Sequence, residues 1–155
     1  PIRGKESHGV HIESLKPILD AGAQLILTCD TGITAYEAID YVNSIGKDRI
    51  RAHEDGLIRY AHDRLREINS LKIIGQAKEK GAVVSFEMKN AHPHDVATII
   101  DRSGVAVRAG THCVMPLLNR IGVTATCRAS FGLYNTKAEV DALAEALIKA
   151  RDFFG

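Results

Sequence analysis

The chain alternates helix-like and strand-like segments, and this alternation limits its fold more than any other feature. Apolar residues recur at helical spacing over about 12–21, 35–45, 48–68, 94–103, 115–121 and 137–154. Short apolar runs typical of strands occupy 23–29, 71–75, 82–88, 105–108 and 124–131. A charged turn at 78–81 predicts a hairpin between two of these runs. We therefore expect an α/β (α+β) fold, a single compact domain with a mixed sheet of about five strands packed against helices.

Composition and charge exclude several classes of protein. The 155 residues are 45% hydrophobic and 25% charged, which is typical of a globular domain with its own core. A net charge of +1 gives no electrostatic reason to bind nucleic acid or a membrane, and no apolar run approaches the ~20 residues of a membrane span. Cys29, Cys113 and Cys127 form no CxxC pair, so we expect a reducing, cytoplasmic compartment. Because the first residue is Pro1 rather than Met, we expect a start that is processed or cut from a longer chain.

The segment 108–116 holds the strongest candidate for chemistry. Cys113 lies there in a polar turn, with Arg108 and His112 nearby in the sequence. The thiolate is the reactive form of cysteine and neighbouring cations favour it, so this setting suits a nucleophile. A structural cysteine in a loop is the alternative, and the residues alone leave it open.

Polar residues inside the predicted elements give a second candidate. Arg128 lies within the apolar run 124–131. An arginine is costly to bury without an anion, so it lies at the end of the strand or binds a carboxylate. By contrast, we expect His53 and His62 at the surface of the helix 48–68.

A cluster of histidines and an acid has two readings. His92, His94 and Asp95 stand close enough in the sequence to suggest a metal site. Pro93 and Asp95 also suit the first turn of the helix 94–103, where proline fits and an acid complements the helix dipole. We favour the capping role.

Several motifs give the chain a resemblance to a known family. They are 45–46 (Ile-Gly), 52–54 (Ala-His-Glu), 104–108, Gly110 with His112-Cys113, Pro116, 127–130 (Cys-Arg-Ala-Ser), 134–136 and 139–141. From about residue 41 to the end, the sequence closely resembles the carboxyl-terminal small domain of SufS-type cysteine desulfurases. These are pyridoxal-phosphate enzymes of the class V aminotransferase group.

The resemblance implies roles for four residues. Cys113 matches the nucleophile that takes sulfur from substrate cysteine and holds it as a persulfide. Arg128 matches the arginine that binds the substrate carboxylate, for which a bidentate fork is well suited. Arg108 and His112 match residues that shape the cysteine pocket. The family passes its sulfur to an acceptor protein.

The family's cofactor site is missing from these residues. The resemblance implies pyridoxal phosphate held by a preceding large domain, through a lysine in a His-Lys pair, an aspartate at the pyridinium nitrogen and a stacked histidine. No histidine in this sequence is followed by lysine. The cofactor stores the electrons during carbon–sulfur cleavage. We therefore expect no cofactor and no native enzyme activity, with Cys113, Arg128, Arg108 and His112 as vestigial site residues.

The leading part resembles a different family. Residues 6–46, above all 21–35, are similar to part of the DHH-superfamily phosphoesterases, which include RecJ-type exonucleases. Asp30 occupies the position of a manganese ligand in that family, although alone it is more often a turn residue. The family's Asp-His-His triplet is absent, and 51–55 reads Arg-Ala-His-Glu-Asp. One carboxylate cannot hold two metal ions, so we expect no metal and treat Asp30 as a vestigial ligand position.

The two resemblances together favour a chimera. A phosphoesterase-like α-β-α segment, 1–45, would join a desulfurase-like segment, 46–155, and fold with it as one domain, without native catalysis. A laboratory recombination product fits this best. The alternatives are a cofactor-independent persulfide carrier, or sulfurtransferase, that uses Cys113, and a piece of a pyridoxal-phosphate-dependent desulfurase. The large domain would normally cover apolar surface, which the segment 12–45 could cover instead or use to extend the sheet. The alternative is a homodimer through that surface, and we expect no nucleic acid and no membrane as partners.

Overall fold

The computed structural model describes residues 40, 43–75 and 77–155. The chain divides into two units, Pro1–Glu54 with Gly132–Tyr134, and Asp55–Phe131 with Asn135–Gly155. The predicted helix 12–21, the predicted strand 23–29, Asp30 and most of the predicted helix 35–45 lie outside the described residues. The second unit holds the sheet. The division at 45/46 into two family-like segments stays a prediction.

Four described strands form one antiparallel sheet in the order β1-β2-β4-β3. They are β1 (Leu71–Ile74), β2 (Val83–Met88), β3 (Arg108–Gly110) and β4 (Thr126–Ser130). The predicted hairpin is confirmed, because β1 pairs antiparallel with β2. The α/β fold class is also confirmed. The described sheet has four strands instead of about five, and all its pairings are antiparallel instead of mixed.

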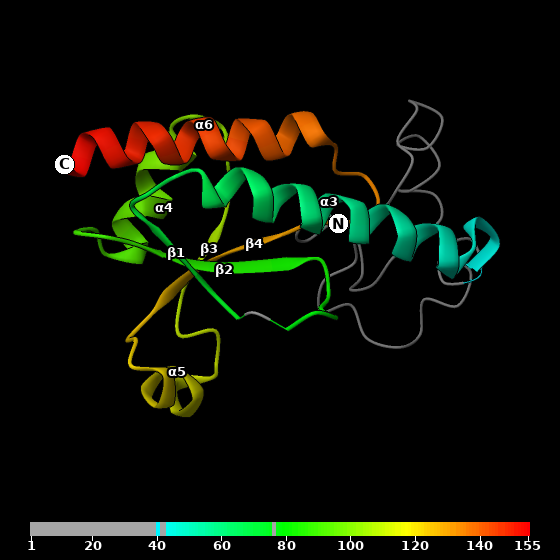
Figure 1. The fold of residues 1–155 in the computed structure, drawn as a ribbon, viewed down its shortest axis with the longest axis horizontal. Helices are drawn as coiled ribbons and strands as arrows, with labels where there is room; N and C mark the ends of the chain where they lie inside the picture. The colour runs from blue at the N-terminus through cyan, green and yellow to red at the C-terminus, as the bar shows by residue number, and fades with distance from the viewer. Residues whose placement is uncertain (1–39, 41–42, 76) are drawn as a thin grey trace, which may run out of the picture. The chain divides into compact units, whose positions relative to one another are not determined.

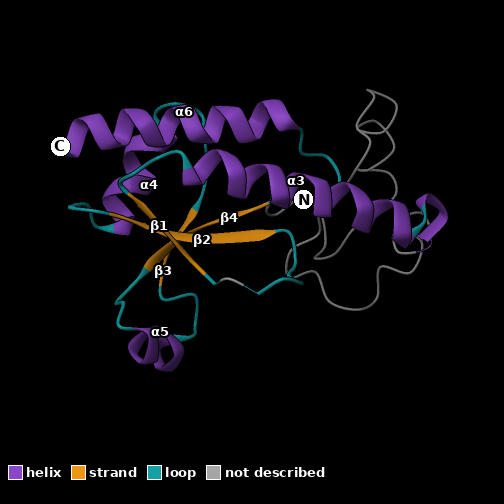
Figure 2. Ribbon diagram, in the orientation of Figure 1, coloured by secondary structure: helices purple, strands orange, loops and turns teal. Residues whose placement is uncertain are grey.

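Helices cover one face of this sheet. They are α3 (Lys47–Arg66), which belongs to the second unit from residue 55 on, α4 (Pro93–Asp101) and α6 (Lys137–Phe154). Their buried apolar side chains form the core with Phe86 of β2 and Cys127 of β4. Figure 1 shows α3 and α6 on one side of the sheet and the short helix α5 (Met115–Ile121) on the other, and Figure 2 separates strands from helices by colour.

The helix ends follow from their capping residues. In α6, Thr136 accepts a hydrogen bond from the Glu139 amide while the Glu139 carboxylate accepts one from the Thr136 amide, a complete capping box. In α4, the ring of His92 accepts from the His94 amide, Pro93 opens the first turn and Asp95 lies in it. The capping interpretation of this cluster is confirmed.

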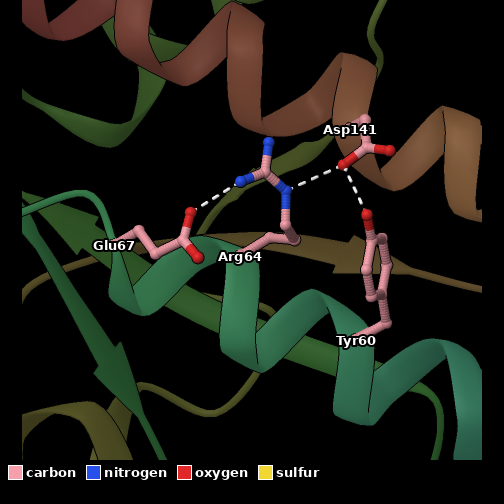
Figure 3. A network of polar contacts seen from close by, with 4 residues as sticks. All are labelled: Tyr60, Arg64, Glu67 and Asp141. Carbon is pink, nitrogen blue, oxygen red and sulfur yellow. Dashed lines mark hydrogen bonds and ion pairs between the residues drawn. The ribbon is translucent and has the colours of Figure 1, made fainter.

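A polar network joins α3 to α6 (Figure 3). The Tyr60 hydroxyl and the Arg64 Nε each donate to Asp141 Oδ1 over 2.8 Å, and a second Arg64 nitrogen lies 2.6 Å from Glu67 Oε2. Hydrogen bonds from Arg64 and then from Tyr60 lower the pKa of Asp141. The contacts fix the register of the two helices over the core.

Two local expectations are wrong in detail. Of the predicted strand 105–108, only Arg108 lies in the observed strand, which is Arg108–Gly110 and pairs with β4 at 126–128. His62 is only 6% exposed instead of lying at the surface, and its Nε2 is 3.0 Å from Lys80 Nζ. Helical spacing places His62 among the buried residues of α3, and Lys80, in the loop before β2, contacts its ring.

Among the described residues, no helix combines the length and apolar character that crossing a membrane requires. The helix α5 nevertheless exposes apolar side chains, with Met115 56% and Leu117 54% exposed. The homodimer alternative and the cytoplasmic location stay predictions.

Candidate functional site

A tight turn between β3 and α5 presents Cys113. His112 and Cys113 both have left-handed backbones, with φ of 52° and 60°, directly after Gly110 at 130°. The Val114 amide donates a hydrogen bond of 2.9 Å to the Thr111 carbonyl, and this bond closes the turn. Left-handed backbone costs a residue other than glycine roughly 1–2 kcal/mol, so surrounding contacts must hold this turn. The Cys113 thiol is exposed and free, as a nucleophile needs.

His112 anchors the turn to the sheet. Its Nε2 lies 3.0 Å from both the carbonyl oxygen and the hydroxyl oxygen of Thr126 on β4. Its Nδ1 is buried with no hydrogen-bond partner. Burial lowers the pKa of His112 and the Arg128 and Arg108 charges lower it further, while the bond to the Thr126 carbonyl opposes them. The ring is therefore neutral at pH 7.

Two arginines face each other beside the turn. Arg108 on β3 lies directly opposite Arg128 on β4, and Ser85 on β2 lies opposite Arg128 on its other side. Like charges directly opposite across strands repel, because their Cβ atoms are only about 4.5–5.5 Å apart. The Nε of Arg128 is also buried without a hydrogen-bond partner. An anion such as a carboxylate would relieve both costs.

Three of the site residues, Arg108, His112 and Cys113, border an open cleft of about 470 Å³, and Arg128 is not among its lining residues. Its lining includes His92, His94, Arg108, His112 and Cys113. None of its lining residues is a lysine or an acid. The cleft is thus lined by cationic and neutral groups beside an exposed thiol, which suits an anionic ligand.

The second described cysteine, Cys127, differs from Cys113 in burial and in hydrogen bonding. Cys127 is buried in the core, and its thiol donates to the Pro93 carbonyl over 3.1 Å. Burial raises the pKa of Cys127 to about 12, so it stays a thiol at pH 7. Of the two described cysteines, only Cys113 can act as a nucleophile.

The structure brings together Cys113, His112, Arg108 and Arg128, the four site residues predicted from the sequence. Asp30 lies outside the described residues. Among the residues that the structure does describe, no group of three or more metal-binding side chains is placed to hold an ion.

The sequence analysis missed Thr126. The available signal was spacing: in a strand, residues two apart share a face, so Thr126 lies on the same face as Arg128. Its contact with His112 depends on a turn that is distant in the sequence, and no periodic pattern predicts such a contact.

Comparisons with known proteins show which family this chain belongs to. The profile of the aminotransferase class-V family matches residues 8–143. A probable cysteine desulfurase of Streptomyces coelicolor is 53% identical over 120 residues, covering 76% of this chain and 29% of the relative. A probable cysteine desulfurase of Staphylococcus epidermidis is 45% identical over 136 residues, covering 87% of this chain and 32% of the relative.

Solved structures agree. The cysteine desulfurase CsdA from Escherichia coli aligns with a TM-score of 0.71 at 30% identity, over 76% of this chain and 29% of that one. The chain thus spans about three-tenths of the length of the relatives it matches. The profile begins at residue 8, inside the segment predicted to resemble a phosphoesterase, and that resemblance stays a prediction. The chain belongs to the aminotransferase class-V family.

Proposed function

We propose that this chain is the sulfur-carrying part of a cysteine desulfurase, in which Cys113 holds a persulfide and passes it to an acceptor. One observation carries the proposal: the exposed Cys113 thiol lies in a strained turn beside a pair of facing arginines. Arg128, with its buried unpaired Nε, would bind the carboxylate of a cysteine-derived donor.

The proposed reaction is a thiol exchange. The Cys113 thiolate attacks the outer sulfur of a small-molecule persulfide donor, such as cysteine persulfide. A new S–S bond forms as the donor's S–S bond breaks, the donor leaves as a thiolate, and the proton on the transferred sulfur moves with it. Cys113 then carries the persulfide. Transfer to an acceptor thiolate repeats the same exchange and regenerates the Cys113 thiolate.

The residues that line the cleft beside Cys113 do not fit pyridoxal phosphate, the cofactor that the family resemblance implies. A Schiff base needs a lysine amine and the pyridinium nitrogen needs a carboxylate, and the cleft beside Cys113 is lined by neither. We therefore propose that this chain alone does not break the carbon–sulfur bond of cysteine. Its chemistry is limited to accepting and passing sulfur that is already at the persulfide level.

We also propose that the chain is a chimera joined near residue 45. The support is the phosphoesterase-like pattern over 21–35, with Asp30 at the position of a ligand. Titration with Mn²⁺ in a calorimeter tests whether this segment retains its parent's metal site, and we expect no binding heat. Saturable binding that Asp30→Ala removes would contradict the vestigial role given to Asp30.

The persulfide proposal is tested by mass spectrometry. The reduced chain is treated with cysteine persulfide, and we expect a mass increase of one sulfur on the peptide containing Cys113. The variant Cys113→Ala should lose this modification completely, while Cys127→Ala should keep it. A modification that persists in Cys113→Ala, or none in the wild type, would contradict the proposal.

A second experiment tests the proposed lack of cleavage. The chain is incubated with pyridoxal phosphate and L-cysteine, and released sulfide is measured. We expect no sulfide above that from cofactor and cysteine alone. Turnover that depends on the protein would show that its residues hold the cofactor after all.

A further inference from the structure

We propose that Thr126 is a positioning residue: its carbonyl and hydroxyl fix His112 in one tautomer and thereby hold the left-handed turn that presents Cys113. The inference deepens the proposed sulfur-carrying function and rests on it for its biological meaning. The geometry itself can be tested without any persulfide. It assigns a role to a buried residue that the proposed chemistry does not use.

The turn needs an anchor outside itself. Two successive residues other than glycine, His112 and Cys113, have positive φ, a conformation that persists only where surrounding contacts determine it. Within the turn, the Val114–Thr111 backbone bond closes the chain but leaves the direction of the His112 ring free. The ring's contacts with Thr126, both 3.0 Å, tie the turn to the sheet.

The hydrogen-bond geometry assigns the tautomer. A carbonyl oxygen only accepts, so His112 Nε2 must carry the proton for its 3.0 Å contact with the Thr126 carbonyl to be favourable. With that proton on Nε2, the Thr126 hydroxyl oxygen can share it as a second acceptor. In the opposite tautomer, the lone pair on Nε2 would face a lone pair of the Thr126 carbonyl oxygen, which is unfavourable. The proton would then lie on Nδ1, which is buried without a hydrogen-bond partner.

Thr126 is itself held rigidly. It pairs with Gly110 across β3 and β4, and it is 1% exposed although it lies on the face of the sheet away from the helices. A buried hydroxyl needs a partner, and His112 provides one. Through its contacts with His112, Thr126 therefore fixes the Cys113 turn relative to the sheet.

The variant Thr126→Val tests this role because valine keeps the shape and removes the hydroxyl. The carbonyl remains, so the ring loses one of its two acceptors. We expect the rate of Cys113 alkylation by iodoacetamide to fall by about two- to tenfold, which is the effect of one neutral hydrogen bond on the population of the presenting turn. The variant Thr126→Ser keeps the hydroxyl and should restore the wild-type rate.

Nitrogen-15 NMR of the His112 ring supplies a readout that a general loss of stability would not change. Because the carbonyl acceptor remains, we expect the proton on Nε2 in wild type, Thr126→Ser and Thr126→Val alike. The Nε2–H resonance of Thr126→Val should nevertheless shift relative to wild type and Thr126→Ser, because the ring has lost its second acceptor. The matched control is Thr98→Val, which removes an exposed hydroxyl bound to the His94 carbonyl and should leave both readouts unchanged.

The variant His112→Leu keeps the test valid if Thr126→Val fails to fold, because His112 lies in a loop. It should slow alkylation at least as much as Thr126→Val, and the double variant should be no slower than His112→Leu alone. Unchanged alkylation together with an unchanged Nε2–H resonance in Thr126→Val, a proton on Nδ1 in the wild type, or strictly additive losses in the double variant would overturn the proposal. Loss of persulfide acceptance with these results intact would instead count against the proposed function.

Discussion

The two faces of the sheet show how neighbouring residues on one strand take opposite roles. Cys127 points into the core, where burial keeps it a thiol and its hydrogen bond goes to the Pro93 carbonyl. Arg128, the next residue, faces Arg108 on the side away from the main helices. The first residue contributes to stability, whereas the second creates unpaired positive charge, which is useful only when an anion binds.

The buried polar residues follow the same division. Only two described polar residues are buried, His62 and Thr126. His62 lies on α3 and is paired with Lys80, whereas Thr126 lies on the open face and is paired with His112. The helix-covered layer thus carries the stability of the domain, and the open face carries the site. Three predictions test this division.

The largest stability effect should come from Phe86. Its side chain is fully buried in the core, so Phe86→Ala should lower the free energy of unfolding by about 3–5 kcal/mol. Its neighbour Ser85 points to the open face opposite Arg128, and Ser85→Ala should change stability by less than about 0.5 kcal/mol. Urea unfolding followed by circular dichroism measures both. Similar losses in the two variants would show that both faces of β2 are structural.

Removing the charge of Arg128 should affect binding but not the fold. Arg128→Met removes a buried unpaired Nε and the repulsion from Arg108, so stability should stay equal or rise by up to about 1 kcal/mol. We expect L-alanine, an amino-acid carboxylate, to raise the melting temperature of the wild type, and we expect this increase to disappear in Arg128→Met. Arg120→Met, on the exposed part of α5, is the matched control and should keep it. A strongly destabilised Arg128→Met would place Arg128 among the residues that hold the fold.

The smallest effect concerns the pH dependence of stability through His62. Burial, then the charges of Lys80 and Arg66, lower the pKa of His62 below its ordinary 6.5, while Asp63 opposes them. Below about pH 6.5 the His62 ring therefore binds a proton in the unfolded chain more readily than in the folded chain. The free energy of unfolding consequently decreases as the pH decreases.

His62→Gln removes this titration and can still accept from Lys80. Between about pH 7.5 and about pH 5.5, its melting temperature should fall less than that of the wild type. The His112 ring, whose pKa is also lowered, supplies an acid sensitivity that both proteins share. Identical pH profiles would show that His62 charges without cost in the folded state.

The sequence predicted the site residues better than their arrangement. Cys113, His112 and Arg108 are close in the sequence, so their proximity followed from the turn between a strand and a helix. Arg128 was predicted as a site residue because burying an arginine inside an apolar strand without an anion is costly. The register of the sheet places it opposite Arg108. The role of Thr126 could not be predicted, because it depends on contact with a turn fourteen residues earlier in the sequence.

By itself, the sequence determined the helices and strands of the second unit, because apolar periodicity and capping residues act over one or two turns of chain. It set the two ends of α6 through Thr136 and a regular apolar stripe, and it indicated the paired strands β1 and β2. Only the tertiary structure decided which polar groups are buried and which charges face each other. Burial and register depend on segments that are distant in the sequence, and local pattern carries no information about where those segments meet.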